Sequence, residues 1–318
     1  MSMMFPDPVT STGPPAVAVR DLRVRVPSPG RAYAAPVEVL RGLTFTAPAG
    51  QVTALVGANG AGKTTALRAI TTTLPFSDGT LEVLGIELGP ANVPFPARAS
   101  HVPDDPVYPE HWTAHDVARL RRRVAPDFNL RAFGAMLTAQ GVAHDRRRSE
   151  LSRGQITQLG VAAALAEDPQ LLILDEPFAR LDPLARTDLV DELRMLMARG
   201  DRSIVLATHD LEGMERFVDH LVVVADGKDV IEGDIESLRE EFLVLDAALD
   251  ENEFRGEGAP LIGASTVGGR TTALVSTEDV VGLPPRSDVR RPTVSELVTH
   301  FLRAAGTSDH STPRGRTV

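Results

Sequence analysis

The sequence predicts an α/β fold with a mainly parallel sheet, an antiparallel β side sheet, a helical insertion and a small α+β appendage at the C-terminal end. Short apolar runs at 52–56, 171–174 and 203–207 are typical of strands covered on both faces, and helical patterns separate them along the chain. A glycine-rich stretch directly follows the first of these runs. In such a sheet, ligands bind beyond the carboxyl ends of the strands.

The first part of the chain is predicted to form the side sheet. Residues 16–26 and 37–46 alternate apolar and polar side chains, as half-buried strands do, and lead into the strand at 52–56. Residues 1–15 are rich in Pro, Ser and Thr and lack the pattern of a secretion signal, so we expect a disordered tail. After the glycine-rich stretch we expect a helix at 65–73, a turn at 77–79 and a strand at 81–84.

The middle of the chain is predicted to carry the helical insertion, at about residues 105–160. Six prolines between 90 and 109 exclude a continuous helix there and leave a loop around a short strand at 99–102. Helical spacing at 113–124 and 130–139 supplies the helices of the insertion. The later elements are predicted as helices at 155–166, 188–199 and 211–217 and a strand at 221–224.

The composition changes after residue 240. Residues 241–306 are predicted to form the small α+β domain, and residues 307–318 a flexible polar tail. The expected elements of this domain are strands at 242–245, 260–262 and 272–275 and a helix at 294–303.

The composition also argues against several classes of function. Lys and Arg number 33 against 43 Asp and Glu, and this net charge of −10 argues against nucleic acid as a partner. The basic runs 121–123 and 146–148 fit a solvated surface, with an anionic lipid or a partner protein as the alternative contact. The chain has no cysteine, so it has no thiolate nucleophile or thiolate metal site. Its apolar runs are shorter than the about 20 residues that cross a bilayer, so we expect no membrane span.

The stretch Gly57–Thr64 reads G-x-x-x-x-G-K-[ST] between a strand and a helix, which is the pattern of a phosphate-binding P-loop. Its glycines allow main-chain N–H groups to approach a polyphosphate closely. Lys63 supplies a positive charge to the β- and γ-phosphates, and Thr64 offers its hydroxyl to Mg²⁺. The expected nucleotide-binding residues here are Gly57, Asn59, Gly60, Ala61, Gly62, Lys63, Thr64 and Thr65. The stretch predicts a P-loop NTPase, but it names no reaction.

Polar residues also follow the other buried strands. Asp175 is placed to hold Mg²⁺ through water, and Glu176 to accept a proton from a water that attacks the γ-phosphate. An acidic pair at this place is as often a helix cap. His209 follows the strand at 203–207 and can contact the γ-phosphate, although a lone histidine there is more often a packed or solvent-facing residue. Ser152 begins a helix whose N-terminus can bind a further anion.

Together these stretches resemble the ATP-binding subunit of an ABC transporter over residues 16–240. Five stretches are similar to family motifs in the family's order: Gly57–Thr64 to Walker A, Leu151–Gln155 to the LSGGQ signature, Leu171–Glu176 to Walker B, Ala179–Asp182 to the D-loop and Thr208–Asp210 to the His switch. The resemblance implies ATP and Mg²⁺ as cofactors and Glu176 and His209 as catalytic residues. It implies Thr64, Asp175 and Asp104 as residues directed at the metal, since Asp104 stands where the family's Q-loop glutamine would fall.

The resemblance also implies partners. Two such domains pair head to tail, so that ATP on one chain is completed by Ser152, Gly154, Gln155 and Asp182 of the other. Hydrolysis then drives export through a separate transmembrane permease, with the ATPase cytoplasmic and peripheral on the inner face of the cell membrane. The pair is either a homodimer or a heterodimer with a paralogue. The alternative is a soluble ATP-switched regulatory or assembly ATPase of the same superfamily without a transport role.

Three positions depart from the family's pattern. The aromatic residue that stacks on adenine is missing near Val26, and Tyr33 is a candidate substitute. Asp104 is shorter than glutamine and anionic, and Arg153 stands where the signature usually has glycine. In the insertion, a groove for the permease's coupling helix is one interpretation of Val107, Tyr108 and Trp112, and plain local packing is the other.

Overall fold

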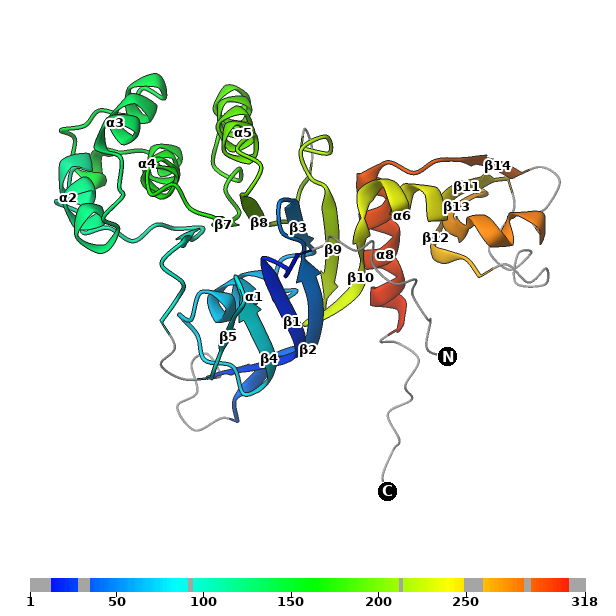
Figure 1. The fold of residues 1–318 in the computed structure, drawn as a ribbon. Coiled ribbons are helices and arrows are strands. Elements are labelled where there is room, and N and C mark those ends of the chain that lie inside the picture. The colour runs from blue at the N-terminus through cyan, green and yellow to red at the C-terminus, as the bar shows by residue number, and fades with distance from the viewer. Residues whose placement is uncertain are drawn as a thin grey trace.

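The computed structural model describes residues 13–27, 35–90, 94–211, 214–248, 260–282 and 287–308. Its central sheet has six strands in the order β10-β9-β3-β8-β7-β6 (Figure 1). The pairs among β6, β7, β8, β3 and β9 are parallel, and β10 joins β9 in an antiparallel hairpin. The strands are β3 (Val52–Val56), β6 (Ala99–Val102), β7 (Leu171–Asp175), β8 (Ser203–Thr208), β9 (His220–Ala225) and β10 (Lys228–Asp234). The prediction of a mainly parallel sheet is confirmed.

The N-terminal part forms the antiparallel side sheet that the sequence predicts. Its order is β2-β1-β4-β5, built from β1 (Val17–Val26), β2 (Val37–Ala47), β4 (Asp78–Val83) and β5 (Ile86–Leu88). The helix α1 (Lys63–Ile70) contributes Leu67 and Ile70 to the core between this sheet and the central one. The C-terminal end of β3 and the start of α1 are therefore held by two sheets.

The inner strands β3, β7 and β8 are mainly apolar because they face a core on both sides. In β7, Leu172 and Leu174 join one hydrophobic cluster, whereas Leu171 and Ile173 join the cluster under the side sheet. All five side chains of β3 are buried as well. Continuous apolar runs, rather than alternating ones, are the expected pattern for such strands.

The helical insertion has a core of its own. It consists of α2 (Ala114–Val124), α3 (Leu130–Ala139), the short 3₁₀ helix η1 (Arg148–Glu150) and α4 (Arg153–Leu165). Phe133, Leu137 and Leu159 belong to its separate hydrophobic cluster. Figure 1 shows α2, α3 and α4 grouped at one side of the molecule. The helix α5 (Pro183–Met197) stands next to α4, on the side toward β3 and β9. The segment after β6 enters this unit and α4 leads out of it to β7.

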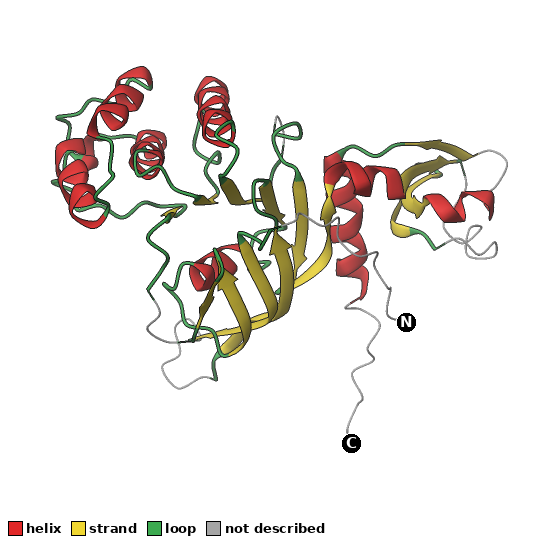
Figure 2. Cartoon of the chain, viewed as in Figure 1, coloured by secondary structure: helices red, strands yellow, loops and turns green. Residues whose placement is uncertain are grey.

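The C-terminal part forms a third sheet, of order β12-β13-β11-β14, beside the central one (Figure 2). Its elements are α6 (Ile235–Glu241), β11 (Phe242–Ala247), β12 (Ile262–Val267), β13 (Arg270–Ser276), η2 (Thr277–Gly282), β14 (Ser287–Arg290) and α8 (Val294–Ser308). The rings of Phe242 and Phe301 meet edge to face with centroids 5.3 Å apart. Both belong to the same hydrophobic cluster as Leu221 and Val223 of β9. Because this core is continuous, an independent domain at 241–306 stays a prediction.

Several predicted elements are wrong in detail. Residues 78 and 79 of the predicted turn at 77–79 instead begin β4, where a Cβ at Gly79 (φ 96°) would lie 2.5 Å from the Asp21 carbonyl oxygen. The close approach of the paired strand requires glycine at this position. In the sequence, the same glycine after Ser and Asp is also typical of a turn. The helix predicted from 188 begins at Pro183, with Asp182 as its cap. Residues 214–217, part of the helix predicted at 211–217, form turns instead.

Some elements were not predicted. They are β5, β10, α6, β14 and the 3₁₀ helices η1 and η2, and the strand predicted at 260–262 overlaps β12 only at Ile262. The predicted tails 1–15 and 307–318 lie almost wholly outside the described residues. In the part of the chain that the structure describes, no helix combines the length and the apolar character needed to cross a membrane.

Candidate nucleotide-binding site

The predicted phosphate loop lies between β3 and α1 and is braced by main-chain atoms. A Cβ at Gly57 would lie 2.2 Å from the carbonyl oxygen of Val224, and one at Gly62 (φ 112°) would lie 2.7 Å from Leu40. Gly60 has open space around it, and only its φ of 85° favours glycine. The Gly227 N–H donates to the Ala61 carbonyl (2.9 Å), which ties the loop to the β9–β10 hairpin. The loop is therefore a fixed cradle of main chain, as a polyphosphate site requires.

Lys63 lies inside this cradle. Its ammonium donates to the carbonyls of Gly57 (2.7 Å) and Ala58 (3.2 Å), and only 5% of the residue is exposed. Burial lowers the pKa of Lys63, while the carboxylates of Glu176 and Asp175 act in the opposite direction. Its nitrogen is 3.7 Å from Glu176 Oε1. The ammonium is thus held at the centre of the loop, within reach of bound phosphate oxygens.

The other loop residues lie around the cradle. Asn59 and Gly60 are exposed, Ala61 is buried, and Thr64 and Thr65 are half-buried in the first turn of α1. The N-cap position of α1 is Gly62, and no side chain caps the helix. The positive end of the helix dipole thus points into the loop without a competing acceptor at the cap.

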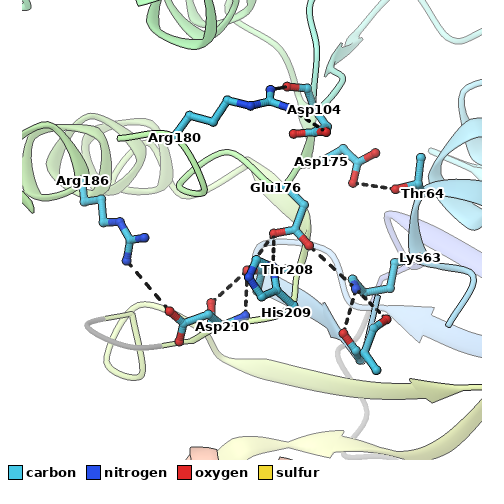
Figure 3. Close-up of polar contacts among 12 residues, drawn as sticks. Lys63, Thr64, Asp104, Asp175, Glu176, Arg180, Arg186, Thr208, His209 and Asp210 are labelled. Atoms are coloured by element: carbon cyan, nitrogen blue, oxygen red, sulfur yellow. Dashed lines mark hydrogen bonds and ion pairs between the residues drawn. The ribbon is translucent and has the colours of Figure 1, made fainter. Parts of the chain in front are cut away.

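Thr64 and Asp175 come together across the site (Figure 3). The Thr64 hydroxyl donates to Asp175 Oδ1 at 3.1 Å. Asp175 is 3% exposed, and burial raises its pKa to about 6, with the nearby charges of Asp104 and Glu176 acting in the same direction. A hydroxyl beside crowded carboxylates fits Mg²⁺, which is usually held by one or two carboxylates together with substrate phosphates. No group of three acidic or histidine side chains among the described residues forms a metal cage by itself, so the fit depends on bound phosphate.

Glu176 and His209 lie in direct contact, as their predicted shared role requires. His209 Nδ1 is 2.9 Å from Glu176 Oε2, and the Thr208 hydroxyl lies 3.4 Å from the same oxygen. Glu176 has a φ of 48°, rare for a residue with a side chain, and its N–H donates to the Ala207 carbonyl at 2.8 Å. Strained main chain of this kind is often found at functional sites. The side chain of His209 is 47% exposed, so it faces solvent as well as Glu176, and its catalytic role stays a prediction.

Asp104 is bound by an arginine that was not among the predicted site residues. Arg180 donates to the carboxylate of Asp104 (3.1 Å) and to its main-chain carbonyl. Figure 3 shows the pair above Asp175, with Arg180 reaching in from the loop before α5. Arg180 belongs to the stretch Ala179–Asp182 that the sequence analysis singled out. Nothing in the sequence indicates, however, that its side chain contacts residue 104. The role of Asp104 toward a metal stays a prediction.

The predicted signature residues are at the surface. Ser152 caps α4 and exchanges reciprocal hydrogen bonds with Gln155, at 3.1 Å and 3.0 Å. Gly154 packs against the loop before α5, where a Cβ would lie 2.8 Å from the Arg180 carbonyl oxygen. Asp182 caps α5 by accepting from the Ala185 N–H at 2.9 Å. Within this chain Ser152, Gln155 and Asp182 act as helix caps, and their contact with nucleotide stays a prediction.

The candidate adenine-stacking and groove residues are only partly exposed to solvent. Val26 is half-buried against the side-sheet core, and Tyr33 lies outside the described residues. Tyr108 and Trp112 pack in the core of the insertion, whereas Val107 is 85% exposed. Local packing therefore accounts for two of the three proposed groove residues.

These features define a P-loop ATPase of the kind that carries its helical insertion between β6 and β7. The family model described as "ABC transporter" matches residues 40–179. The Nod factor export ATP-binding protein I of Paraburkholderia xenovorans (strain LB400) is 33% identical, with 84% of this chain and 92% of that protein covered. The chain therefore belongs to the ABC transporter family of ATP-binding proteins. This confirms the family resemblance and favours the transport ATPase over the soluble regulator.

Further comparisons agree on the fold. The Nod factor export ATP-binding protein I of Rhizobium meliloti (strain 1021) is 37% identical over 61% of this chain, and the matched region spans 59% of that protein's length. A solved ATP-binding subunit of an ABC transporter is 27% identical and superposes with a TM-score of 0.60, covering 70% of this chain and 92% of the other. The predicted fold class, including P-loop, parallel sheet and helical insertion, is confirmed.

Proposed function

We propose that this chain is the ATP-binding and ATP-hydrolysing subunit of an ABC transporter that drives export through a separate transmembrane permease. The observation that carries the proposal is the contact of Glu176 with both His209 (2.9 Å) and Lys63 (3.7 Å) at the mouth of the phosphate loop. This contact puts a candidate base beside the group that would bind the γ-phosphate. The names of the relatives support export as the direction of transport.

The binding step uses groups that the loop already presents. The phosphates of ATP lie along the main-chain N–H groups of Gly60 to Thr65 and against the end of α1. The Lys63 ammonium exchanges the carbonyls of Gly57 and Ala58 for phosphate oxygens. Thr64 and Asp175 would hold Mg²⁺, which supplies positive charge that offsets the negative charge of the phosphates.

The hydrolytic step uses Glu176 as general base. Its carboxylate takes a proton from the water that attacks the γ-phosphate, and the products are ADP and inorganic phosphate. His209 Nδ1 and the Thr208 hydroxyl both contact Oε2 and so fix the direction of this carboxylate. When Lys63 binds phosphate, its contact with Glu176 Oε1 weakens and that oxygen becomes available to the water.

The signature residues are proposed to act on a second ATPase chain. Ser152 and Arg153 are exposed, and Ser152 begins α4, so their N–H groups and charge can face a nucleotide bound elsewhere. Head-to-tail pairing of two copies, or of this chain with a paralogue, brings them to the partner's ATP. The assembled pair would sit on the inner face of the membrane against its permease.

The test is ATP turnover combined with size-exclusion chromatography of Glu176→Gln in ATP and Mg²⁺. Glutamine keeps the size and polarity of the side chain but removes the base. We expect turnover to fall at least about 100-fold, since general-base catalysis contributes about 10²–10⁴-fold, and we expect the variant to accumulate as an ATP-dependent dimer. His209→Ala serves as the second variant, because it leaves Glu176 in place but unoriented, and a smaller loss is expected. Wild-type protein that binds ATP but does not hydrolyse it, alone or with a co-purified permease, would contradict the proposal.

A further inference from the structure

Arg180 connects three segments of the chain that lie far apart in sequence. Its guanidinium donates to the carboxylate and the main-chain carbonyl of Asp104. Asp104 lies two residues after the end of β6. Its own carbonyl oxygen lies against Gly154 at the start of α4, where a Cβ would come within 2.8 Å. Two residues later, Asp182 caps α5. Arg180 therefore lies where the loop after β7, the entry of the helical insertion and its exit meet.

These contacts link the loop after Glu176 to the two ends of the helical insertion. Asp104 is the last residue before the insertion, and Gly154 lies in the first turn of the helix by which the insertion returns to β7. The loop that carries Arg180 follows Glu176 directly. The entry of the insertion is thus hydrogen-bonded to the loop between Glu176 and α5, and its exit packs closely against the same loop.

The form of the Asp104 contact favours a positioning role over metal binding. One of its two hydrogen bonds goes to the main-chain carbonyl, which holds the segment itself and not only its side chain. Of the two side chains Arg180 is the more buried, at 24% exposed against 42% for Asp104. The guanidinium also sets a positive charge beside an aspartate that would otherwise add its charge to the crowded site of Asp175 and Glu176.

We propose that Asp104 is a positioning residue that acts through Arg180: the pair fastens the loop after Glu176 to the entry of the helical insertion, beside the packing contact at its exit, and Asp104 is not a metal ligand. This inference rests on the proposed ATPase function. It predicts that the Asp104 side chain has its effect only through Arg180, so the two positions are energetically coupled.

The test is a double-mutant cycle with Asp104→Ala, Arg180→Ala and the double variant. Turnover is measured with saturating ATP at increasing Mg²⁺, and Mg²⁺-dependent binding of a fluorescent ATP analogue is measured separately. We expect each single variant to lose about 3- to 10-fold in turnover and the double variant to lose no more than Arg180→Ala, as for coupled neighbours. The Mg²⁺ concentration for half-maximal nucleotide binding should stay within about 2-fold of wild type.

Two milder variants keep the test decisive if an alanine variant unfolds. Asp104→Asn keeps a side-chain oxygen for Arg180, which Asp104→Ala lacks, so it should keep more turnover than Asp104→Ala with unchanged Mg²⁺ dependence. Arg180→Lys keeps the charge but loses the two-pronged donor and should resemble Arg180→Ala. A matched control is Arg202→Ala, which breaks a comparable pair with Asp168 (3.0 Å) at the other end of α5 and should leave turnover unchanged.

The contrary results are distinct. A rise of about 10-fold or more in the Mg²⁺ requirement for binding in Asp104→Ala and Asp104→Asn, with none in Arg180→Ala, would make Asp104 a metal-directed group and overturn the inference. Losses that multiply in the double variant would overturn it as well. Wild-type protein without ATPase activity would instead contradict the proposed function, whatever the variants do.

Discussion

The phosphate loop and the signature segment are both glycine-containing turns that begin a helix, yet the structure treats them differently. At the phosphate loop, Lys63 is buried and contacts Glu176, and α1 has no side-chain cap. At the signature segment, Ser152 and Arg153 are exposed, and Ser152 forms a capping box with Gln155 of its own helix. The N-terminus of α1 is therefore buried and uncapped, so it can accept an anion. The N-terminus of α4 is exposed and is capped by Ser152. The α1 end therefore has no side-chain acceptor at its cap, whereas the cap of α4 is already satisfied within the chain, and contact of the signature segment with a second molecule stays a prediction.

The largest expected effect breaks the internal half of this comparison. In Gly57→Ala, the new Cβ would lie 2.2 Å from the Val224 carbonyl oxygen, and both are held by main chain, so the loop must shift. A shift that breaks one or two hydrogen bonds to phosphate, at about 1.5–3 kcal/mol each, lowers ATP affinity by about 100-fold, and a titration with a fluorescent analogue measures this. Gly134→Ala is the control, because its Cβ would meet only His144 at 3.6 Å. An affinity within about 3-fold of wild type would mean that the loop is pliable.

The second prediction separates the stability of the phosphate site from its function. Because the folded-state pKa of Asp175 is raised from 3.8 to about 6, the folded protein holds this proton more tightly than the unfolded chain does. The free energy of unfolding therefore falls as pH rises from about 4 to about 6, and above pH 6 the full cost is present. Asp175→Asn removes that cost and still offers an oxygen to Thr64, so we expect a gain of about 1–3 kcal/mol at pH 7.5.

The measurement for Asp175→Asn is urea unfolding without nucleotide at pH 5 and pH 7.5. The advantage of the variant over wild type should be larger at pH 7.5. The same variant should lose the Mg²⁺-dependent part of its nucleotide affinity, since the negative charge is gone. A stability difference that does not change with pH would show that the Asp175 carboxylate is well solvated in the folded protein.

The third prediction concerns the surface half. Ser152→Ala removes the cap of α4 and should cost about 1 kcal/mol of stability. Asn129→Ala removes the cap of α3, where Asn129 accepts from the Ala132 N–H, and should cost a similar amount. In a Glu176→Gln background, only Ser152→Ala should weaken the ATP-dependent dimer in size-exclusion chromatography. Equal behaviour of the two variants would reduce Ser152 to a helix cap.

The same contrast explains which parts of the molecule the sequence could predict. The phosphate loop and the buried strands were predictable because local spacing decides them: the glycines, Lys63 and the apolar run into Asp175 lie within a few residues of one another. Strand β4 was misread because Gly79 serves a close strand pairing that resembles a turn in sequence. The partnership of Asp104 with Arg180 spans 76 residues, and it depends on how the insertion folds back. No local pattern records such a contact.

A last contact shows how the unit that carries the signature is attached to the rest. Gln140 at the end of α3 donates from Nε2 to both carboxylate oxygens of Glu192 on α5, at 2.9 Å and 3.1 Å. Burial raises the pKa of Glu192 to about 7, and the charge of Asp188 adds to the effect. The buried Gln140 Oε1 has no hydrogen-bond partner among the described residues. A glutamine at position 192 can supply that missing donor.

The smallest expected effect is therefore a gain, and it depends on pH. The raised pKa means that wild-type stability falls between pH 4.5 and about 7, so Glu192→Gln should be more stable than wild type at pH 8 and close to it at pH 5. The side chain is half-buried, so solvent reduces the effect to about 1 kcal/mol or less. Thermal unfolding of wild type and Glu192→Gln at the two pH values measures it. If Glu192→Gln instead loses stability at pH 8, the carboxylate itself holds α3 to α5, and the insertion is attached by charge rather than by the amide contact.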